Sequence, residues 1–189
     1  MADNVYVDAT YKSLNKYKEE LCGDNVEILK NDDKYIVVLS DGLGSGVKAN
    51  ILSTLTAKII STMLYDGSTI EDTVDTIVHT LPICNVRKVA YSTFIILQVD
   101  YKGNAYLVEF DAPGCIFIRN GKRIDINYSH REIAGKPIKE ARFKVEADDV
   151  LTLMSDGVIF AGIGNLMNLG WSWENVCKFV THKTHKGIS

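Results

Sequence analysis

The stretch Tyr35-Ile-Val-Val-Leu-Ser-Asp-Gly-Leu-Gly-Ser-Gly-Val-Lys-Ala-Asn50 decides how this sequence is interpreted. Its first half is apolar and largely β-branched, which is typical of a buried strand. The apolar run ends at Asp41-Gly42, and a helical pattern follows the glycines. This order predicts a strand that holds the Asp41 carboxylate at its end. There, Gly42 lets backbone carbonyl and amide groups approach a small ion or a phosphate closely.

The tripeptide Ser-Asp-Gly occurs a second time in the chain. Residues 150–154 form another largely apolar run, and Ser155-Asp156-Gly157 follows it directly. A strand of this kind would end in the same way as the first. The sequence therefore predicts a second strand-end carboxylate, Asp156.

A third carboxylate is placed by strand pairing. Residues 25–30 and 35–39 have strand character, and the polar turn at 31–33 joins them into a predicted hairpin. In a hairpin the first residues of one strand lie beside the last residues of the other. Asp24 is therefore expected beside Asp41.

The remaining elements predict an α+β fold in which helices cover antiparallel sheets. A helix at residues 47–65 is expected to pack on a sheet through Val47, Ile51, Leu55, Ile59, Ile60 and Met63, which recur at three- and four-residue steps. A second helix, at residues 70–81 with Ser68 or Thr69 as its N-cap, is expected on the same face. An antiparallel meander is predicted from short strands at 90–100, 105–110, 115–118, 123–126, 143–146 and 150–153, followed by a last helix within 166–180.

Length and composition indicate one soluble domain over residues 1–189, with 46% hydrophobic and 24% charged residues. The net charge of −3 and the lack of a basic block argue against nucleic-acid and anionic-membrane surfaces. No apolar run is long enough to span a bilayer and no signal peptide is evident, so a cytoplasmic location is expected. The four cysteines are widely spaced and predict neither a zinc ribbon nor a dithiol redox site.

Three aspartates at strand ends or turns indicate the chemistry. Carboxylate oxygens are hard ligands that suit Mg²⁺ or Mn²⁺, and no His or Cys cluster accompanies them to favour zinc or iron. Two such ions about 3.5 to 4 Å apart activate a water and clamp a phosphoryl oxygen. Hydrolysis of a phosphate monoester is the natural candidate reaction.

The order of several motifs resembles the metal-dependent serine/threonine protein phosphatase superfamily. More narrowly, it is similar to the bacterial branch that includes the stage II sporulation phosphatase and the stress-response regulator phosphatases. The resemblance spans about residues 20 to 160. It is carried by Gly23-Asp24, Ser40-Asp41-Gly42-Leu-Gly-Ser-Gly46, Tyr91-Ser-Thr-Phe94, Asp111-Ala-Pro-Gly114 and Met154-Ser-Asp-Gly-Val158.

This resemblance implies an α-β-β-α sandwich of two antiparallel sheets flanked by helices. It also implies that Asp24 and Asp41 are the catalytic carboxylates and hold two Mn²⁺ or Mg²⁺ ions, with the Gly42 carbonyl on one ion and Asp156 on the other. The implied substrate is phosphoserine or phosphothreonine in a regulatory protein, and the implied nucleophile is a metal-bound water. The implied setting is bacterial sporulation or stress signalling.

One departure from the family pattern bears on activity. An Asp-Asp-x-Thr-type motif, which the family usually carries near its end, is not found after Asp156. We expect the chain to be truncated at its C-terminus, with a weakly bound second metal and an unpaired sheet edge. The alternative is a phosphatase-like binding or scaffolding domain with little or no turnover.

A nucleotide-binding interpretation competes for the glycine-rich loop. Gly44-Ser-Gly46-Val-Lys-Ala49 fits a relaxed dinucleotide-binding pattern, and Asp66 lies twenty residues past Gly46. A dinucleotide fold requires a second parallel strand before that acid, whereas Asp66 follows directly on the predicted helix. The strand-end Asp41 would also repel a pyrophosphate unless a metal intervened.

Overall fold

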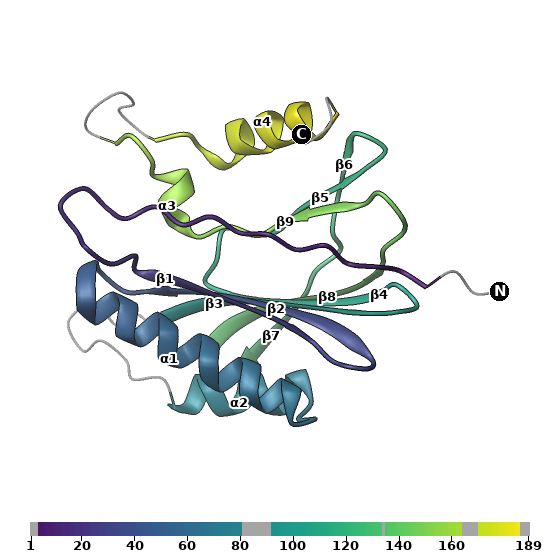
Figure 1. The fold of residues 1–189 in the computed structure, drawn as a ribbon, viewed down its shortest axis with the longest axis horizontal. Helices are drawn as coiled ribbons and strands as arrows, with labels where there is room; N and C mark the ends of the chain where they lie inside the picture. Colours follow the sequence, from purple (N-terminus) through teal and green to yellow (C-terminus); the bar gives the residue numbers. More distant parts are fainter. Residues whose placement is uncertain (1–3, 81–91, 134, 164–169, 186–189) are drawn as a thin grey trace.

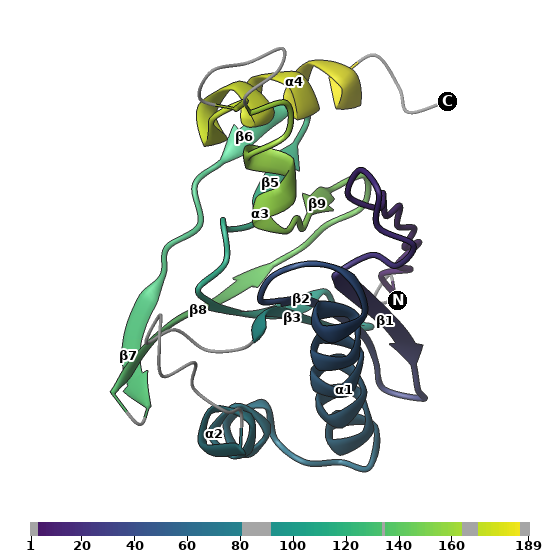
Figure 2. The ribbon, with the colours of Figure 1, turned by 90° about the vertical axis from the view of Figure 1, so that its left-hand side faces the viewer.

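The fold has four layers: helices, a large sheet, a small sheet, and helices again (Figure 1). It is seen in a computed structural model that describes residues 4–80, 92–133, 135–163 and 170–185. Figure 2 shows α1 and α2 side by side below the large sheet, with the small sheet, α3 and α4 on its other side. This arrangement confirms the predicted α+β sandwich of two antiparallel sheets flanked by helices.

The large sheet has six antiparallel strands in the order β1-β2-β3-β4-β8-β7. Its strands β2, β3 and β4 are largely buried, because helices cover one face and the small sheet covers the other. The bounds are β1 Asp24–Lys30, β2 Lys34–Gly42, β3 Ser92–Asp100, β4 Asn104–Phe110, β7 Ser129–Ile133 and β8 Lys136–Lys144.

The small sheet has three strands in the order β6-β5-β9, and two further helices lie beside it. Its strands are β5 Ile116–Arg119, β6 Lys122–Ile124 and β9 Val150–Thr152. The four helices of the described residues are α1 Gly46–Tyr65, α2 Ile70–Thr80, α3 Asp156–Ile159 and α4 Trp173–His185.

Three apolar clusters hold the layers together. The first joins α1 and α2 to the large sheet, the second lies between the two sheets, and the third packs α3 and α4 on the small sheet. Met154 belongs to the third cluster, so the segment that leads into α3 is fixed by packing just before Asp156. Each layer is therefore stabilised by buried apolar area on the side that faces its neighbour.

The predicted buried face of α1 is wrong in its first half. Val47, Ile51 and Leu55 are 62%, 58% and 56% exposed. The helix instead buries smaller side chains, including Ala49 and Ala57, whose size lets its backbone approach the sheet closely. The full buried set is Gly46, Ala49, Ser53, Thr56, Ala57, Ile60, Ser61 and Leu64.

Most predicted elements are present, with changes at β8 and at the ends. The expected strand at 143–146 overlaps only the end of the nine-residue β8, and β7 was not expected. Thr69 is the N-cap of α2, since its hydroxyl accepts a hydrogen bond from the Asp72 amide at 3.0 Å. Leu81, the predicted end of that helix, lies outside the described residues, as does Tyr91 of the third motif.

The described cysteines, Cys22, Cys115 and Cys177, are free thiols. The last two are buried. Among the helices of the described ranges, none combines the length and the apolar character needed to cross a membrane.

Candidate metal and phosphate site

Asp24 and Asp41 are directly paired across the β1–β2 hairpin. The register runs from Lys30 opposite Tyr35 to Asp24 opposite Asp41, so the polar turn at one end sets the pairing at the other. Opposed residues in an antiparallel pair have Cβ atoms about 4.5 to 5.5 Å apart on the same face. The predicted proximity of the two carboxylates is confirmed.

Asp41 lies in an environment that disfavours its charge. Burial, followed by the negative charges of Asp24 and Asp156, raises the pKa of Asp41 to about 8. The wall beside it includes Leu39, Ala112 and Met154, which come from β2, the β4–β5 loop and the segment before α3. A cation at this place would relieve the repulsion among the carboxylates.

Ser155 joins the third carboxylate to the first pair. Its hydroxyl donates a hydrogen bond to Oδ2 of Asp24 at 2.7 Å, across 131 residues of sequence. The next residue, Asp156, is the first residue of α3. The start of α3 therefore lies beside Asp24, the first residue of β1. Figure 1 shows α3 on the small-sheet side of the large sheet, above the end of β1.

Gly42 is required by packing at the end of β2. A Cβ atom there would lie 2.0 Å from the carbonyl oxygen of Ala49 in α1. The Gly42 amide donates to the carbonyl of Gly23 at 3.1 Å, which extends the hairpin pairing by one bond. The first turn of α1 therefore lies directly against the strand end that holds Asp41.

The oxygen atoms at this site are of the kind that bind a hard, partly hydrated divalent cation. Carboxylates of Asp24, Asp41 and Asp156 and the backbone carbonyl of Gly42 are all oxygen ligands, which Mg²⁺ and Mn²⁺ prefer. Within the residues that the structure describes, no group of three or more His, Cys, Asp or Glu side chains is arranged so that it could hold a metal ion. A bound cation would therefore need backbone oxygen or water among its ligands.

Two serines near the site were not anticipated from the sequence. Ser155 belongs to the motif, but its bond to Asp24 depends on a tertiary contact that no local pattern reveals. Ser92 is fully buried and donates to the carbonyl oxygen of Asp41 at 3.0 Å. Its hydroxyl also pairs with that of Ser40 at 2.7 Å, so the two strand ends are joined by side chains as well as by the ladder.

Comparison with known protein families shows to which family the chain belongs. The family model of Stage II sporulation protein E matches residues 31–185. The chain belongs to this family. The match contains Asp41 and Asp156, and Asp24 lies just before it. No curated protein sequence is significantly similar to the chain.

Solved structures show which fold this family member has. The PP2C phosphatase domain with a regulatory fragment of SpoIIE from Bacillus subtilis aligns with a TM-score of 0.72 at 21% identity, over 93% of this chain and 49% of that one. The RsbU and RsbW domains of a Mycobacterium tuberculosis protein align with a TM-score of 0.69 at 14% identity, over 90% and 48%. RsbX in complex with magnesium aligns with a TM-score of 0.60 at 21% identity, over 91% and 86%.

These likenesses establish the PP2C phosphatase fold for this chain. The chain spans about half the length of the first two structures that it resembles. The described carboxylates therefore stand on a known phosphatase scaffold.

Proposed function

We propose that this chain is a Mn²⁺- or Mg²⁺-dependent phosphatase that hydrolyses phosphoserine or phosphothreonine monoesters in a regulatory protein. The observation that carries the proposal is the meeting of Asp24, Asp41 and Asp156 at one end of a PP2C-type sandwich. The charges of Asp24 and Asp156 raise the pKa of Asp41, and a shared cation would relieve this repulsion.

Different residues of the chain would bind the two ions at this site. Asp24 and Asp41 would be the catalytic carboxylates and would hold two ions together with the Gly42 carbonyl, and Asp156 would hold one of them from the opposite side. When bound, such ions lower the pKa of a water and neutralise charge on the phosphoryl oxygens. The second ion would be the weaker one.

Neighbouring residues would keep these carboxylates in place. Ser155 donates a hydrogen bond to one oxygen of Asp24 and so orients its carboxylate. Leu39, Ala112 and Met154 exclude water from one side of Asp41, which strengthens its interaction with a cation. Orientation of this kind by surrounding groups is worth roughly 10- to 100-fold in metal affinity or activity.

The biological setting is proposed from the relatives. Structures similar to this chain include the cell fate determinant SpoIIE, a protein that joins RsbU and RsbW domains, and a structure described in connection with the bacterial stressosome. We propose that residues 1–189 act as one cytoplasmic phosphatase-like domain whose partner is a phosphorylated regulatory protein of bacterial sporulation or stress signalling.

The test is hydrolysis of p-nitrophenyl phosphate across a Mn²⁺ titration, with Asp41→Asn as the variant. Asn keeps the shape of the side chain and removes its charge, so turnover is expected to fall at least about 100-fold while the fold persists. Asp66→Asn is the matched control, because Asp66 is exposed beyond the end of α1. Isothermal titration of Mn²⁺ into each variant measures binding separately from turnover.

Two outcomes would contradict the proposal. Full turnover in Asp41→Asn would remove Asp41 from the site. Absence of metal-dependent turnover in the wild-type chain, and also in a longer natural chain, would favour the alternative of a phosphatase-like binding or scaffolding domain.

A further inference from the structure

The loop that joins β4 to β5, residues 111–115, forms part of the wall beside Asp41. Its residues Ala112 and Pro113 line the same small cavity as Asp41 and Ser155. The loop carries the chain from the large sheet to the small one, the two sheet layers seen in Figure 1. Its position therefore determines the shape of one side of the candidate metal site.

The backbone of this loop depends on contacts from outside the loop. Asp111 and Gly114 both have left-handed backbone, with φ of 49° and 105°. Residues other than glycine seldom adopt this conformation, so Asp111 is held in it by its surroundings. A Cβ atom at Gly114 would lie 3.6 Å from Oε2 of Glu109 and 3.7 Å from the Trp173 ring. Both of these side chains therefore pack against the loop.

Glu109 is the buried group that closes the loop. Its side chain is 1% exposed and lies on the same face of β4 as Leu107, which belongs to the cluster between the sheets. Its Oε1 accepts hydrogen bonds from the Cys115 amide and from the Tyr128 hydroxyl, each at 2.7 Å. The two bonds join the start of the loop to its end, and both to the segment between β6 and β7.

Both groups that bind Glu109 are donors. The Cys115 amide can only donate, and burial together with the charge of Glu109 raises the pKa of the Tyr128 hydroxyl, which keeps its proton. Hydrogen bonds that share a buried acceptor are stronger than the same bonds in water. Removing the acceptor would take this partner from the amide of Cys115, a buried residue, and would release the end of the loop.

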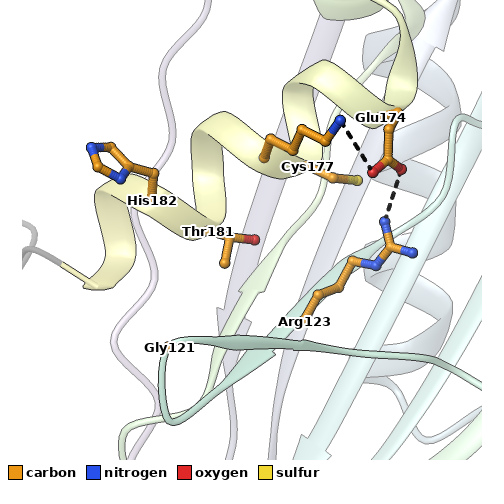
Figure 3. A pocket seen from close by; sticks show the side chains of 7 residues that line it. Gly121, Arg123, Glu174, Cys177, Thr181 and His182 are labelled. Atoms are coloured by element: carbon orange, nitrogen blue, oxygen red, sulfur yellow. Dashed lines mark hydrogen bonds and ion pairs between the residues drawn. The ribbon is translucent and has the colours of Figure 1, made fainter.

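A second tie within the small-sheet side of the molecule provides a comparison. In the pocket that Figure 3 shows, Arg123 of β6 reaches toward Glu174 of α4, at 3.2 Å. Both side chains are exposed. Among the described residues that line the cavity beside Asp41, neither of these two is present. The Arg123–Glu174 pair thus joins elements near the loop without forming the wall of the candidate site.

We propose that Glu109 is a positioning residue for the candidate metal site, an inference that rests on the proposed function. By closing the β4–β5 loop, Glu109 keeps Ala112 and Pro113 packed beside Asp41. Water is then excluded from that side of Asp41, which strengthens the attraction between its carboxylate and a cation. Glu109 acts only through the loop and touches neither the ions nor the substrate.

The experiment compares variants of Glu109 and Tyr128 by isothermal titration of Mn²⁺. E109M replaces the carboxylate with an apolar side chain of similar length, whereas E109Q keeps an oxygen that can accept both hydrogen bonds. Y128F removes one of the two donors. Y106F is the matched control, because Tyr106 donates to Glu140 at 2.9 Å on the opposite face of the large sheet. E174Q is the control for a Glu-to-Gln change near the loop.

We expect E109M to bind Mn²⁺ about tenfold more weakly than wild type and Y128F about threefold more weakly. E109Q, Y106F and E174Q are expected to stay within about twofold of wild type. Affinity that is kept in E109Q but lost in E109M identifies the hydrogen bonds, rather than the volume of the side chain, as the cause. Y128F, which removes only a hydroxyl, gives the same test if E109M does not fold.

Hydrogen exchange gives a measurement that needs no metal. Backbone amides within residues 111–115 are expected to exchange at least about tenfold faster in E109M than in wild type, and less than about twofold faster in Y106F. Equal exchange in E109M and wild type would overturn the proposal, because the loop would then not depend on Glu109. Faster exchange with unchanged Mn²⁺ affinity would overturn it as well, because the loop would then not act on the site.

Failure of the proposed function would be seen in the wild-type chain itself. A wild type that neither binds Mn²⁺ nor hydrolyses p-nitrophenyl phosphate would remove the metal site, and the positioning role of Glu109 with it. Equal Mn²⁺ affinity in wild type, E109M and Y128F would leave the phosphatase proposal intact and overturn only the role of Glu109.

Discussion

Two regions contribute carboxylates to the candidate site, and they hold them by different means. Asp24 and Asp41 stand on β1 and β2, where a seven-residue antiparallel ladder sets their separation. Asp156 begins a four-residue helix after a three-residue strand, so its position depends on side-chain packing and on the bond from Ser155. One pair is fixed by backbone geometry and the third carboxylate by tertiary contacts.

This difference indicates where each part is vulnerable. Backbone pairing is insensitive to most side-chain substitutions. It is disrupted when an added atom forces two packed elements apart. Side-chain anchoring is weakened gradually by single substitutions. The following predictions compare the two regions, beginning with the largest expected loss of stability.

Gly42→Ala is expected to lower the free energy of unfolding by about 3 kcal/mol or more. The new Cβ would lie 2.0 Å from the Ala49 carbonyl oxygen and 2.7 Å from its carbon, and neither can move without displacing α1 from the strand end. Urea unfolding followed by circular dichroism measures the change.

Gly157→Ala is the control from the second region. Its Cβ would meet only Ser155 Oγ at 3.6 Å, an ordinary contact, and the position is inside α3. We expect a change of about 0.5 kcal/mol or less. Similar losses at the two glycines would show that the strand-end region is no more tightly constrained than the loop region.

The strand-end geometry was predictable because it follows from local patterns. A polar turn between two strand-like runs fixes the hairpin register, and the register alone places Asp24 opposite Asp41. The family motifs then gave the four-layer fold. The assigned roles of Asp24, Asp41, Gly42 and Asp156 stay predictions until activity and metal binding are measured.

Other features could not be derived from local pattern. Side-chain hydrophobicity favoured Val47, Ile51 and Leu55 as the inner face of α1, whereas close packing selected the small residues. Strands β7 and β8 lie at one side of the large sheet and carry many charged residues, so their alternation is weak. The Ser155–Asp24 bond joins residues that only the complete fold brings together.

A prediction of intermediate size concerns Glu109, at the point where the chain leaves the large sheet for the small one. Glu109 is 1% exposed. Its Oε1 accepts hydrogen bonds from the Cys115 amide and the Tyr128 hydroxyl, both at 2.7 Å, and its Oε2 has no partner among the described residues. Burial raises the pKa of Glu109.

The sign of the pH dependence follows from this raised pKa. An acid whose folded pKa exceeds its unfolded pKa of about 4.5 stabilises the fold fully below that value, and the contribution is lost as pH rises through the folded pKa. Glu109→Gln keeps an oxygen acceptor and removes the titration. Its melting temperature relative to wild type is therefore expected to increase by about 4 °C between pH 5 and pH 9.

Thermal unfolding of both proteins at several pH values tests this prediction, with Glu132→Gln on the exposed face of β7 as the control. A constant difference between wild type and Glu109→Gln across the range would contradict it. Such a result would mean that Glu109 is ionised to the same extent in the folded and unfolded protein across this range, so its folded pKa would not be raised.

A smaller stability loss than at Gly42 is expected for Ser155→Ala, which removes a side-chain hydrogen bond between the two regions without creating a clash. Loss of one half-buried hydrogen bond is expected to lower the free energy of unfolding by about 1 kcal/mol. Its effect on the site should be larger, because Asp24 would lose one of the contacts that orient its carboxylate. We expect Mn²⁺ affinity to fall about tenfold. Urea unfolding measures the first effect, and isothermal titration of Mn²⁺ measures the second.

Ser129→Ala is the control for Ser155→Ala, because Ser129 also donates one hydrogen bond, to the Glu140 carbonyl, far from the carboxylates in sequence and in the sheet order. Similar stability losses with a change in Mn²⁺ affinity only at Ser155 would show that the bond orients Asp24 as well as stabilising the fold. Unchanged affinity in Ser155→Ala would contradict this. The β1–β2 ladder would then be sufficient to position Asp24, and the second region would contribute only through Asp156.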